Sequence, residues 1–231
     1  MVESPSYARQ AYYDEIRELE HDVLDMGSRA EQMVGQAVDA ICSLDVQLAM
    51  HVILKDDEID ERDLQIETRC LRLLALQQPM ASDLRVVGTA MKMITDIERV
   101  GDLAVDIAKI ALKIEKEFGE TNFIDIPKMA KEARSMLHEA LEAYVQRDLN
   151  RVQEVCDKDE IVDALYRELR TQIFTDMQTN PEQVVADGWL LLAIHHVERI
   201  ADHAVNIAER VNFMVTGELR SFTKKDPSQQ T

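Results

Sequence analysis

The sequence predicts an all-α protein made of two pseudo-symmetric three-helix bundles, with six long helices in total. The first reason is composition: the 231 residues include only 7 glycines and 5 prolines, and aromatic residues make up 5%, which favours helices. The second reason is an internal repeat. Residues 95–108 recur as residues 195–208 with Glu-Arg-(Val/Ile)-small-Asp-x-Ala-Val-(Asp/Asn)-Ile-Ala kept in both copies. A match of this length indicates a duplicated chain.

Apolar residues at helical spacing predict three helices in the first half, over residues 7–44, 46–76 and 81–118. Leu44 and Asp45 mark the first break. The second helix ends before Pro79, because proline cannot continue a helix interior. The only clear linker is residues 119–127, where glycine, asparagine and proline coincide with a lapse in the periodicity.

The same pattern then restarts, with Ala133 and Met136 following Ala30 and Met33 at an offset of 133 − 30 = 103. It predicts helices over residues 128–146, 149–178 and 182–216, the last ending at Gly217, a common helix stop. We therefore expect a first repeat over residues 1–122, a second over 123–217, and a polar, mobile tail over 218–231.

The repeated motif places acidic residues on one helix face. With about 100° per residue, Asp102 and Asp106 lie roughly above Glu98, and the second copy places Asp202 and Asn206 above Glu198. Like charges four residues apart cost a helix about 0.2–0.5 kcal/mol per pair. Such a face is favourable if a metal ion sits between the carboxylates, because hard cations take oxygen ligands. The alternative is a plain acidic surface on an acidic protein.

A second acidic pair also repeats. Asp56 and Asp60 match Asp159 and Asp163, since 159 − 56 and 163 − 60 both give 103. If the second and third helices of each half are antiparallel neighbours, the two acidic pairs can converge. The spacing thus predicts one multinuclear metal site per half.

Charge and cysteine usage limit the classes of function. A net charge of −18 argues against nucleic-acid binding, which needs basic surface. No apolar run reaches the roughly 18 residues of a membrane span, and the first residues lack a signal peptide pattern. Cys42, Cys70 and Cys156 fit no disulfide framework or metal motif, so we expect buried free thiols in the reducing cytoplasm.

The repeated motif, together with Leu-Leu-Ala-Leu-Gln-Gln-Pro at residues 73–79 and Asp-Asp-Glu-Ile-Asp at residues 56–60, resembles the PhoU family. The likeness covers residues 15–218. It implies two three-helix bundles and multinuclear metal clusters, with iron expected first and zinc, manganese or magnesium as alternatives. By position, the implied ligands are Glu98, Asp102, Asp106, Glu198, Asp202, Asn206, Asp56, Asp60, Asp159 and Asp163.

Members of this family are accessory and regulatory proteins of the bacterial phosphate-specific transport system. The resemblance implies a cytoplasmic, non-enzymatic negative regulator of the phosphate regulon. Its implied partners are the ATPase subunit of the phosphate ABC transporter and a sensor histidine kinase, and it would meet the membrane only through them. We also expect a homodimer.

Two departures from the repeat leave the second metal site open to question: His196 replaces Asp96, and Asn206 replaces Asp106. His196 is a candidate ligand, whereas His203 lies on an apolar stripe and is expected in the core or an interface. Arg99 and Arg199 either neutralise the acidic face or bind an anion such as phosphate.

Two alternative functions remain. A carboxylate-bridged di-iron or ferritin-like protein would use Glu-x-x-His, which occurs here only at Glu18 and His21. A metal-free helical adaptor is the other.

Overall fold

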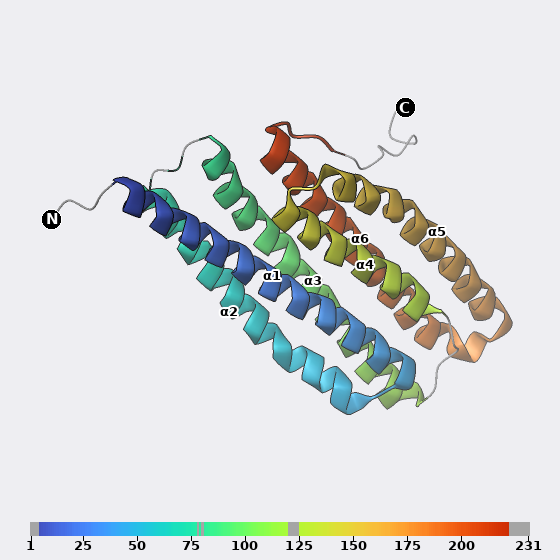
Figure 1. Ribbon diagram of the computed structural model, residues 1–231. Helices are drawn as coiled ribbons and strands as arrows, with labels where there is room; N and C mark the ends of the chain where they lie inside the picture. The colour runs from blue at the N-terminus through green and yellow to red at the C-terminus, as the bar shows by residue number, and fades with distance from the viewer. Residues whose placement is uncertain (1–4, 78, 80, 120–124, 222–231) are drawn as a thin grey trace.

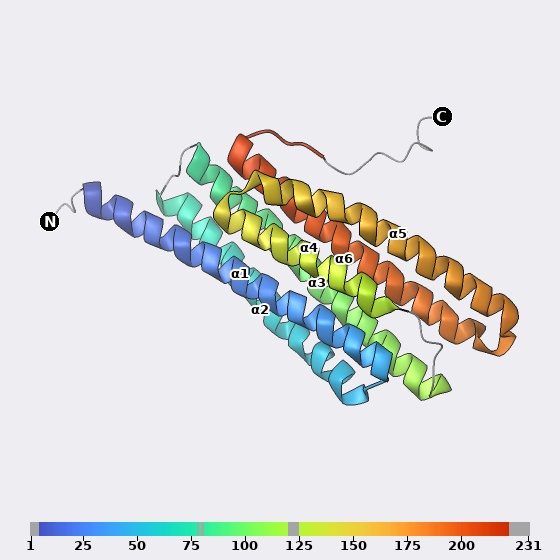
Figure 2. The ribbon, with the colours of Figure 1, turned by 45° about the vertical axis from the view of Figure 1, so that its right-hand side comes forward.

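The computed structural model describes residues 5–77, 79, 81–119 and 125–221, and over these it confirms the all-α class and the duplication. All the helices run along nearly one direction (Figure 1). The outer flanks are α2 and α5, which contact helices of their own repeat, while α1, α3, α4 and α6 lie between them (Figure 2). The helices are α1 (Pro5–Ser43), α2 (Val46–Gln77), α3 (Ser82–Phe118), α4 (Ile126–Gln146), α5 (Leu149–Thr179) and α6 (Val184–Thr216).

The two repeats meet along α3 and α6, which pack antiparallel. Near one end, Arg85 Nε donates a hydrogen bond to the Met214 carbonyl at 3.0 Å. Near the other, Lys113 Nζ lies 4.0 Å from the ring centre of Trp189. We call this α3–α6 contact the seam. The duplicated motif lies at its middle, where Asp96 of one copy contacts His203 and Asn206 of the other.

The predicted break after the first helix is confirmed and recurs in the second repeat. Leu44 and Arg147 adopt left-handed conformations, with φ of 51° and 59°. The aspartate that follows each caps the next helix: Asp45 Oδ1 accepts from the Leu48 amide at 3.0 Å, and Asp148 Oδ1 accepts from the Asn150 amide at 2.9 Å. A left-handed residue followed by a capping aspartate therefore turns the chain in both halves.

Four helix starts differ from the sequence prediction: α1 begins two residues earlier and α3 one residue later than expected, and α4 and α6 differ as well. Helix α4 begins at Ile126, earlier than expected, because Pro127 fits the first turn and Asp125 accepts from the Lys128 amide at 3.3 Å. Helix α6 begins at Val184, after a 3₁₀ turn over Pro181–Gln183. Most of the expected linker, residues 120–124, and residues 222–231 of the expected tail lie outside the described residues.

None of the helices in the described part of the chain combines the length and the apolar character that a membrane span requires. The three cysteines are free; Cys70 is buried, whereas Cys42 and Cys156 are only half-buried. The expectation of free thiols is thus confirmed for all three cysteines, whereas the expectation of full burial is confirmed only for Cys70.

Glycine allows a close approach between the repeats on the other side, where α1 meets α4. A Cβ at position 27 would lie 2.5 Å from Leu141 Cδ1, and Leu141 is itself buried. We expect Gly27→Ala to lower the free energy of unfolding by about 1 kcal/mol, because overpacking outweighs the gain in helix propensity. Gly88→Ala is the matched control: no atom lies within 4 Å of its added Cβ, so it should gain about 0.5–1 kcal/mol. Urea unfolding measures both; equal shifts would contradict the packing argument.

Candidate metal centres

The first candidate site lies where α2 faces α3. The pKa of Asp56 is raised, mainly by partial burial and then by the charges of Asp60 and Asp102. The pKa of Glu98 is raised in the same way, by burial first and then by Asp102, with Asp60 also contributing. The structure therefore brings together the two acidic pairs that the sequence singled out in this half.

The second candidate site repeats this arrangement between α5 and α6. Partial burial, followed by the charges of Asp163, Asp202 and Glu198, raises the pKa of Asp159 to about 6. The pKa of Asp202 is raised by loss of solvent and then by Glu198 and Asp163. Asp159 and Asp202 are thus each affected by the charges of other carboxylates expected at this site.

The two sites have different nitrogen-bearing neighbours. In the first, Arg99 lies beside the acidic pair, with its Nη1 atom 2.6 Å from Asp102 Oδ2 and its Nε atom 3.4 Å from Glu98 Oε2. That Glu98 oxygen is shielded from solvent yet accepts no hydrogen bond. In the second, His195 Nδ1 lies 2.8 Å from Glu198 Oε2. The ion-pairing role expected for Arg99 is confirmed, and the first site retains an unsatisfied buried oxygen.

Asp106 lies one turn further along α3, at the edge of a hollow of about 290 Å³. The hollow is lined in part by Asp56, Asp102, Lys109 and Arg199. Asp106 Oδ1 is 3.4 Å from Lys109 Nζ. Arg199 reaches this hollow from the second repeat and, within the described ranges, makes no ion pair. The two repeated arginines therefore have different surroundings.

The departures from the repeat lie at the seam. Asp96 Oδ1 is 2.9 Å from His203 Nδ1 and accepts a hydrogen bond from Asn206 Nδ2 at 3.2 Å. The interface position expected for His203 is confirmed, and the amide of Asn206 is engaged across the seam. His196 is half-buried with an unpartnered Nδ1; burial lowers its pKa, while the charge of Asp106 opposes that effect. Whether His196 and Asn206 bind metal stays a prediction.

One acidic residue of the first site was not identified from the sequence. Burial, then the charges of Glu67 and Asp60, raises the pKa of Asp63, whose Oδ1 is buried without a hydrogen bond. Its position seven residues after Asp56 puts it on the same helix face. The repeat did not reveal it, because the counterpart in α5 is Tyr166 (63 + 103 = 166).

The donor set fits a hard cation in chemical type. Carboxylate oxygens dominate, several pKa values are raised by mutual repulsion, and Glu98 offers an unsatisfied oxygen. Across the described ranges, however, no three His, Cys, Asp or Glu side chains converge closely enough to hold one metal ion. Coordination would therefore require the carboxylates to turn toward one another, which their repulsion opposes in the absence of a cation.

The arrangement predicts a pH effect on stability at Asp159. Between its ordinary pKa of 3.8 and about 6, the folded protein binds more protons at this group than the unfolded chain, so stability is lost as pH rises through this window. Asp159→Asn should raise the free energy of unfolding at pH 7 by about 1 kcal/mol, allowing for solvent screening. The gain should vanish near pH 4.

Urea titrations at the two pH values test this, with the exposed neighbour Asp157→Asn as control. A gain at Asp159 that does not depend on pH would contradict the electrostatic cause.

The di-iron alternative finds little support in the geometry. Glu18 is 68% exposed and pairs with Arg69 at 3.1 Å, and His21 is exposed as well. These side chains lie on the outer surface of α1, so they do not form a buried ligand pair of the kind that such proteins use.

Comparison with known proteins gives consistent matches. The PhoU domain model matches residues 23–111 and 126–211. A phosphate-specific transport system accessory protein PhoU homolog of Clostridium acetobutylicum is 35% identical over 91% of this chain and 96% of its own; the Caulobacter vibrioides homolog is 37% identical over 90% and 91%. The crystal structure of PhoU from Pseudomonas aeruginosa superposes with a TM-score of 0.84 at 32% identity, covering 90% of this chain and 100% of that one.

Proposed function

Because the chain belongs to the PhoU family, we propose that it is an accessory regulator of phosphate transport with no catalysis of its own. The observation that carries this proposal is the match of both repeats, over nine-tenths of the chain, to proteins named as phosphate-specific transport accessory proteins. A structure from Streptococcus pneumoniae, described as a phosphate transport system regulatory protein, has the same fold with a TM-score of 0.84 at 33% identity.

The finer part of the proposal is negative control of phosphate-starvation genes through two partners, the transporter ATPase subunit and a sensor histidine kinase. The net charge of −18 supports contact with basic surfaces on such partners. No described helix can cross a membrane, so the chain would reach membrane proteins through these contacts. A cytoplasmic location and a homodimer belong to the same proposal.

The proposal also includes one metal site per repeat. The crowded carboxylates of α2 with α3, and of α5 with α6, support this part, because a cation would relieve the repulsion that raises their pKa values. A bound metal would supply positive charge that draws the two helices of a pair together. The protein residues would provide the oxygen ligands, with Arg99 beside the first site and His195 beside the second.

Deletion of the gene tests the regulatory function. Expression of phosphate-starvation genes should rise in phosphate-rich medium and return to its low level when the gene is restored. Unchanged expression in the deletion strain would contradict the proposal.

A further inference from the structure

A pocket of about 160 Å³ lies between α1 and α2, away from the acidic sites. Its walls carry nitrogen-bearing side chains from both helices, and one carboxylate: Arg29, Gln32, Gln36, His51, Lys55 and Glu58. Met33 and Ile59, both buried, contribute apolar surface. A pocket with this many hydrogen-bond donors is unusual in a chain that has 44 acidic and 26 basic residues.

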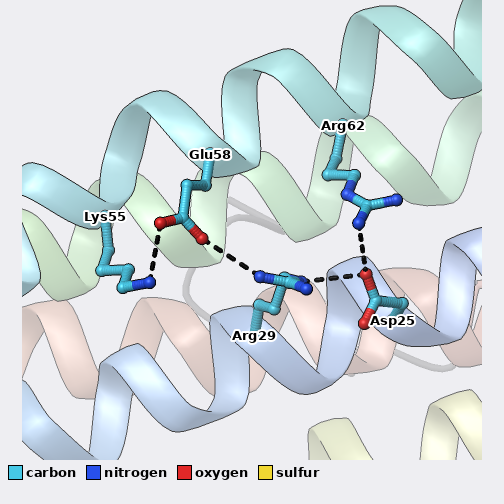
Figure 3. A network of polar contacts seen from close by, with 5 residues as sticks. All are labelled: Asp25, Arg29, Lys55, Glu58 and Arg62. Atoms are coloured by element: carbon cyan, nitrogen blue, oxygen red, sulfur yellow. Dashed lines mark hydrogen bonds and ion pairs between the residues drawn. The ribbon is translucent and has the colours of Figure 1, made fainter.

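The cations of the pocket belong to a network that links α1 to α2 (Figure 3). Arg29 lies at its centre and joins its two carboxylates. Glu58 lies 2.7 Å from Lys55 Nζ and 3.1 Å from Arg29 Nη1. Asp25 Oδ2 lies 2.9 Å from Arg29 Nε and 3.2 Å from Arg62 Nη2. Three positive side chains thus share two carboxylates, so the network keeps one excess positive charge.

The carboxylate of Glu58 shows that the donors of the pocket stabilise a negatively charged oxygen group. The hydrogen bond from Lys55, followed by the charges of Lys55, Arg29 and His51, lowers the pKa of Glu58, so its carboxylate stays ionised among these donors. The side chain is 45% exposed, and its partners are 37–38% exposed. Ion pairs as accessible as these contribute little to stability, so an external anion can take the place of the carboxylate while Glu58 turns to solvent.

Further donors in the pocket are unused. The side chains of Gln32, Gln36 and His51 make no hydrogen bond within the part of the chain that the structure describes. Each can donate an N–H to an oxygen ligand. An oxyanion entering between α1 and α2 would therefore find both charge and free donors.

The second repeat provides an internal comparison. At an offset of 103, Lys55 is retained as Lys158, but Gln36 becomes Glu139 and His51 becomes Glu154. Lys158 Nζ there donates to Ser135 Oγ at 3.0 Å and to Glu139. In addition, Arg29 becomes Glu132 and Glu58 becomes Ile161. The corresponding region between α4 and α5 therefore has a net negative charge, and its lysine, Lys158, is already paired with residues of the protein.

We propose that the α1–α2 pocket of the first repeat binds a small tetrahedral oxyanion carried by inorganic phosphate or by a phosphate monoester. The oxyanion class follows from the donors and the excess charge, whereas the choice of phosphate over other oxyanions rests on the proposed function. Lys55, His51 and the two glutamines provide the contacts, and Arg29 both binds the anion and holds α1 to α2.

Titration calorimetry of the full chain in phosphate-free buffer tests the proposal, with inorganic phosphate, glycerol phosphate and sulfate as separate probes. We expect one equivalent per chain for at least one of the phosphate probes, and weaker binding of sulfate. Gln36→Glu and His51→Glu import the residues of the second repeat and should each weaken binding about tenfold or more. Lys55→Gln should do the same. Lys158→Gln, the matched change in the second repeat, should leave the affinity unchanged.

Tighter binding of inorganic phosphate would identify the free ion as the ligand, and tighter binding of glycerol phosphate would identify the monoester. Absence of binding, equal binding of sulfate, or equal weakening by Lys158→Gln would overturn the proposal. These results are distinct from failure of the regulatory function. If gene deletion derepresses phosphate-starvation genes but the titration shows no binding, the regulatory function stands and the pocket assignment falls.

Discussion

Replacing Asp176 with leucine and Asp187 with valine should raise the free energy of unfolding by about 2 kcal/mol at pH 7. Asp187 on α6 is 1% exposed, and its Oδ2 atom has no hydrogen-bond partner. The residue of the first repeat that corresponds to Asp176 is Leu73, since 176 − 103 = 73. The one that corresponds to Asp187 is Val87, because the offset between α3 and α6 is 100, as in the duplicated motif. Both are buried. The double substitution therefore gives α5 and α6 the apolar residues that α2 and α3 have at the corresponding positions.

The pH dependence distinguishes this explanation from simple repacking. Burial, then the charge of Asp176, raises the pKa of Asp187. Below the ordinary pKa of 3.8 the group is protonated in both states, so the destabilisation of the wild type is absent there; it appears as pH rises from 3.8 and is complete above the raised folded-state pKa. The gain in the double variant should thus be larger at pH 7 than at pH 4.

Urea unfolding at both pH values measures the effect, with Asp187→Asn as a control that removes the charge but keeps the polar shape. The asparagine variant should recover only part of the gain. A double variant that is less stable than the wild type at pH 7 would show that these carboxylates have a stabilising partner.

Removing Glu98 and Asp102 together should abolish metal binding in the first repeat and leave the second site loaded. The reverse is expected when Glu198 and Asp202 are changed to alanine. Among the described residues, the acids whose charges raise the pKa of Glu98 and of Asp202 come from the same repeat in each case, so the two effects should add. Elemental analysis of protein loaded with iron or manganese and then desalted gives the stoichiometry.

Stability gives a second measurement of the same substitutions. Loss of one like-charge pair should leave the metal-free form slightly more stable, by about 0.2–0.5 kcal/mol. Metal should raise the melting temperature of the wild type more than that of either double variant, because it binds only the folded state. Asp57→Ala with Glu61→Ala removes the same charge from exposed positions of α2 and is the matched control. If both double variants bind as much metal per chain as the wild type, the repeated acidic residues are a plain acidic surface and not metal ligands.

The helices and the duplication were predictable because both depend on local spacing. The breaks at Asp45 and Asp148 follow from period and offset. The same spacing placed His203 in the core or an interface, and it indicated the α2–α3 acidic site on the condition that these helices are neighbours. The partners of individual side chains were not predictable. Asn206 has the spacing of a ligand, yet its amide donates to Asp96 across the seam, because helical period gives a direction from the axis but not the neighbour in that direction.

The sequence analysis also did not identify acidic residues that occur in only one of the two repeats. Asp63 and Asp187 each have a buried oxygen without a hydrogen bond, but their counterparts are Tyr166 and Val87. A search for what the two halves share cannot detect them. Aligning the repeats over their full length and asking where charge replaces an apolar residue would identify Asp187.

The antiparallel seam has a consequence for the order of folding. Arg85 contacts a carbonyl 129 positions away, and Thr89 contacts one 121 positions away. The α1–α2 and α4–α5 hairpins, in contrast, join elements that are adjacent in the chain. Closing a long loop costs more chain entropy than closing a short one, so we expect the hairpins to form first and the seam to close last. The rate of refolding would then be governed by residues at the boundary between the repeats.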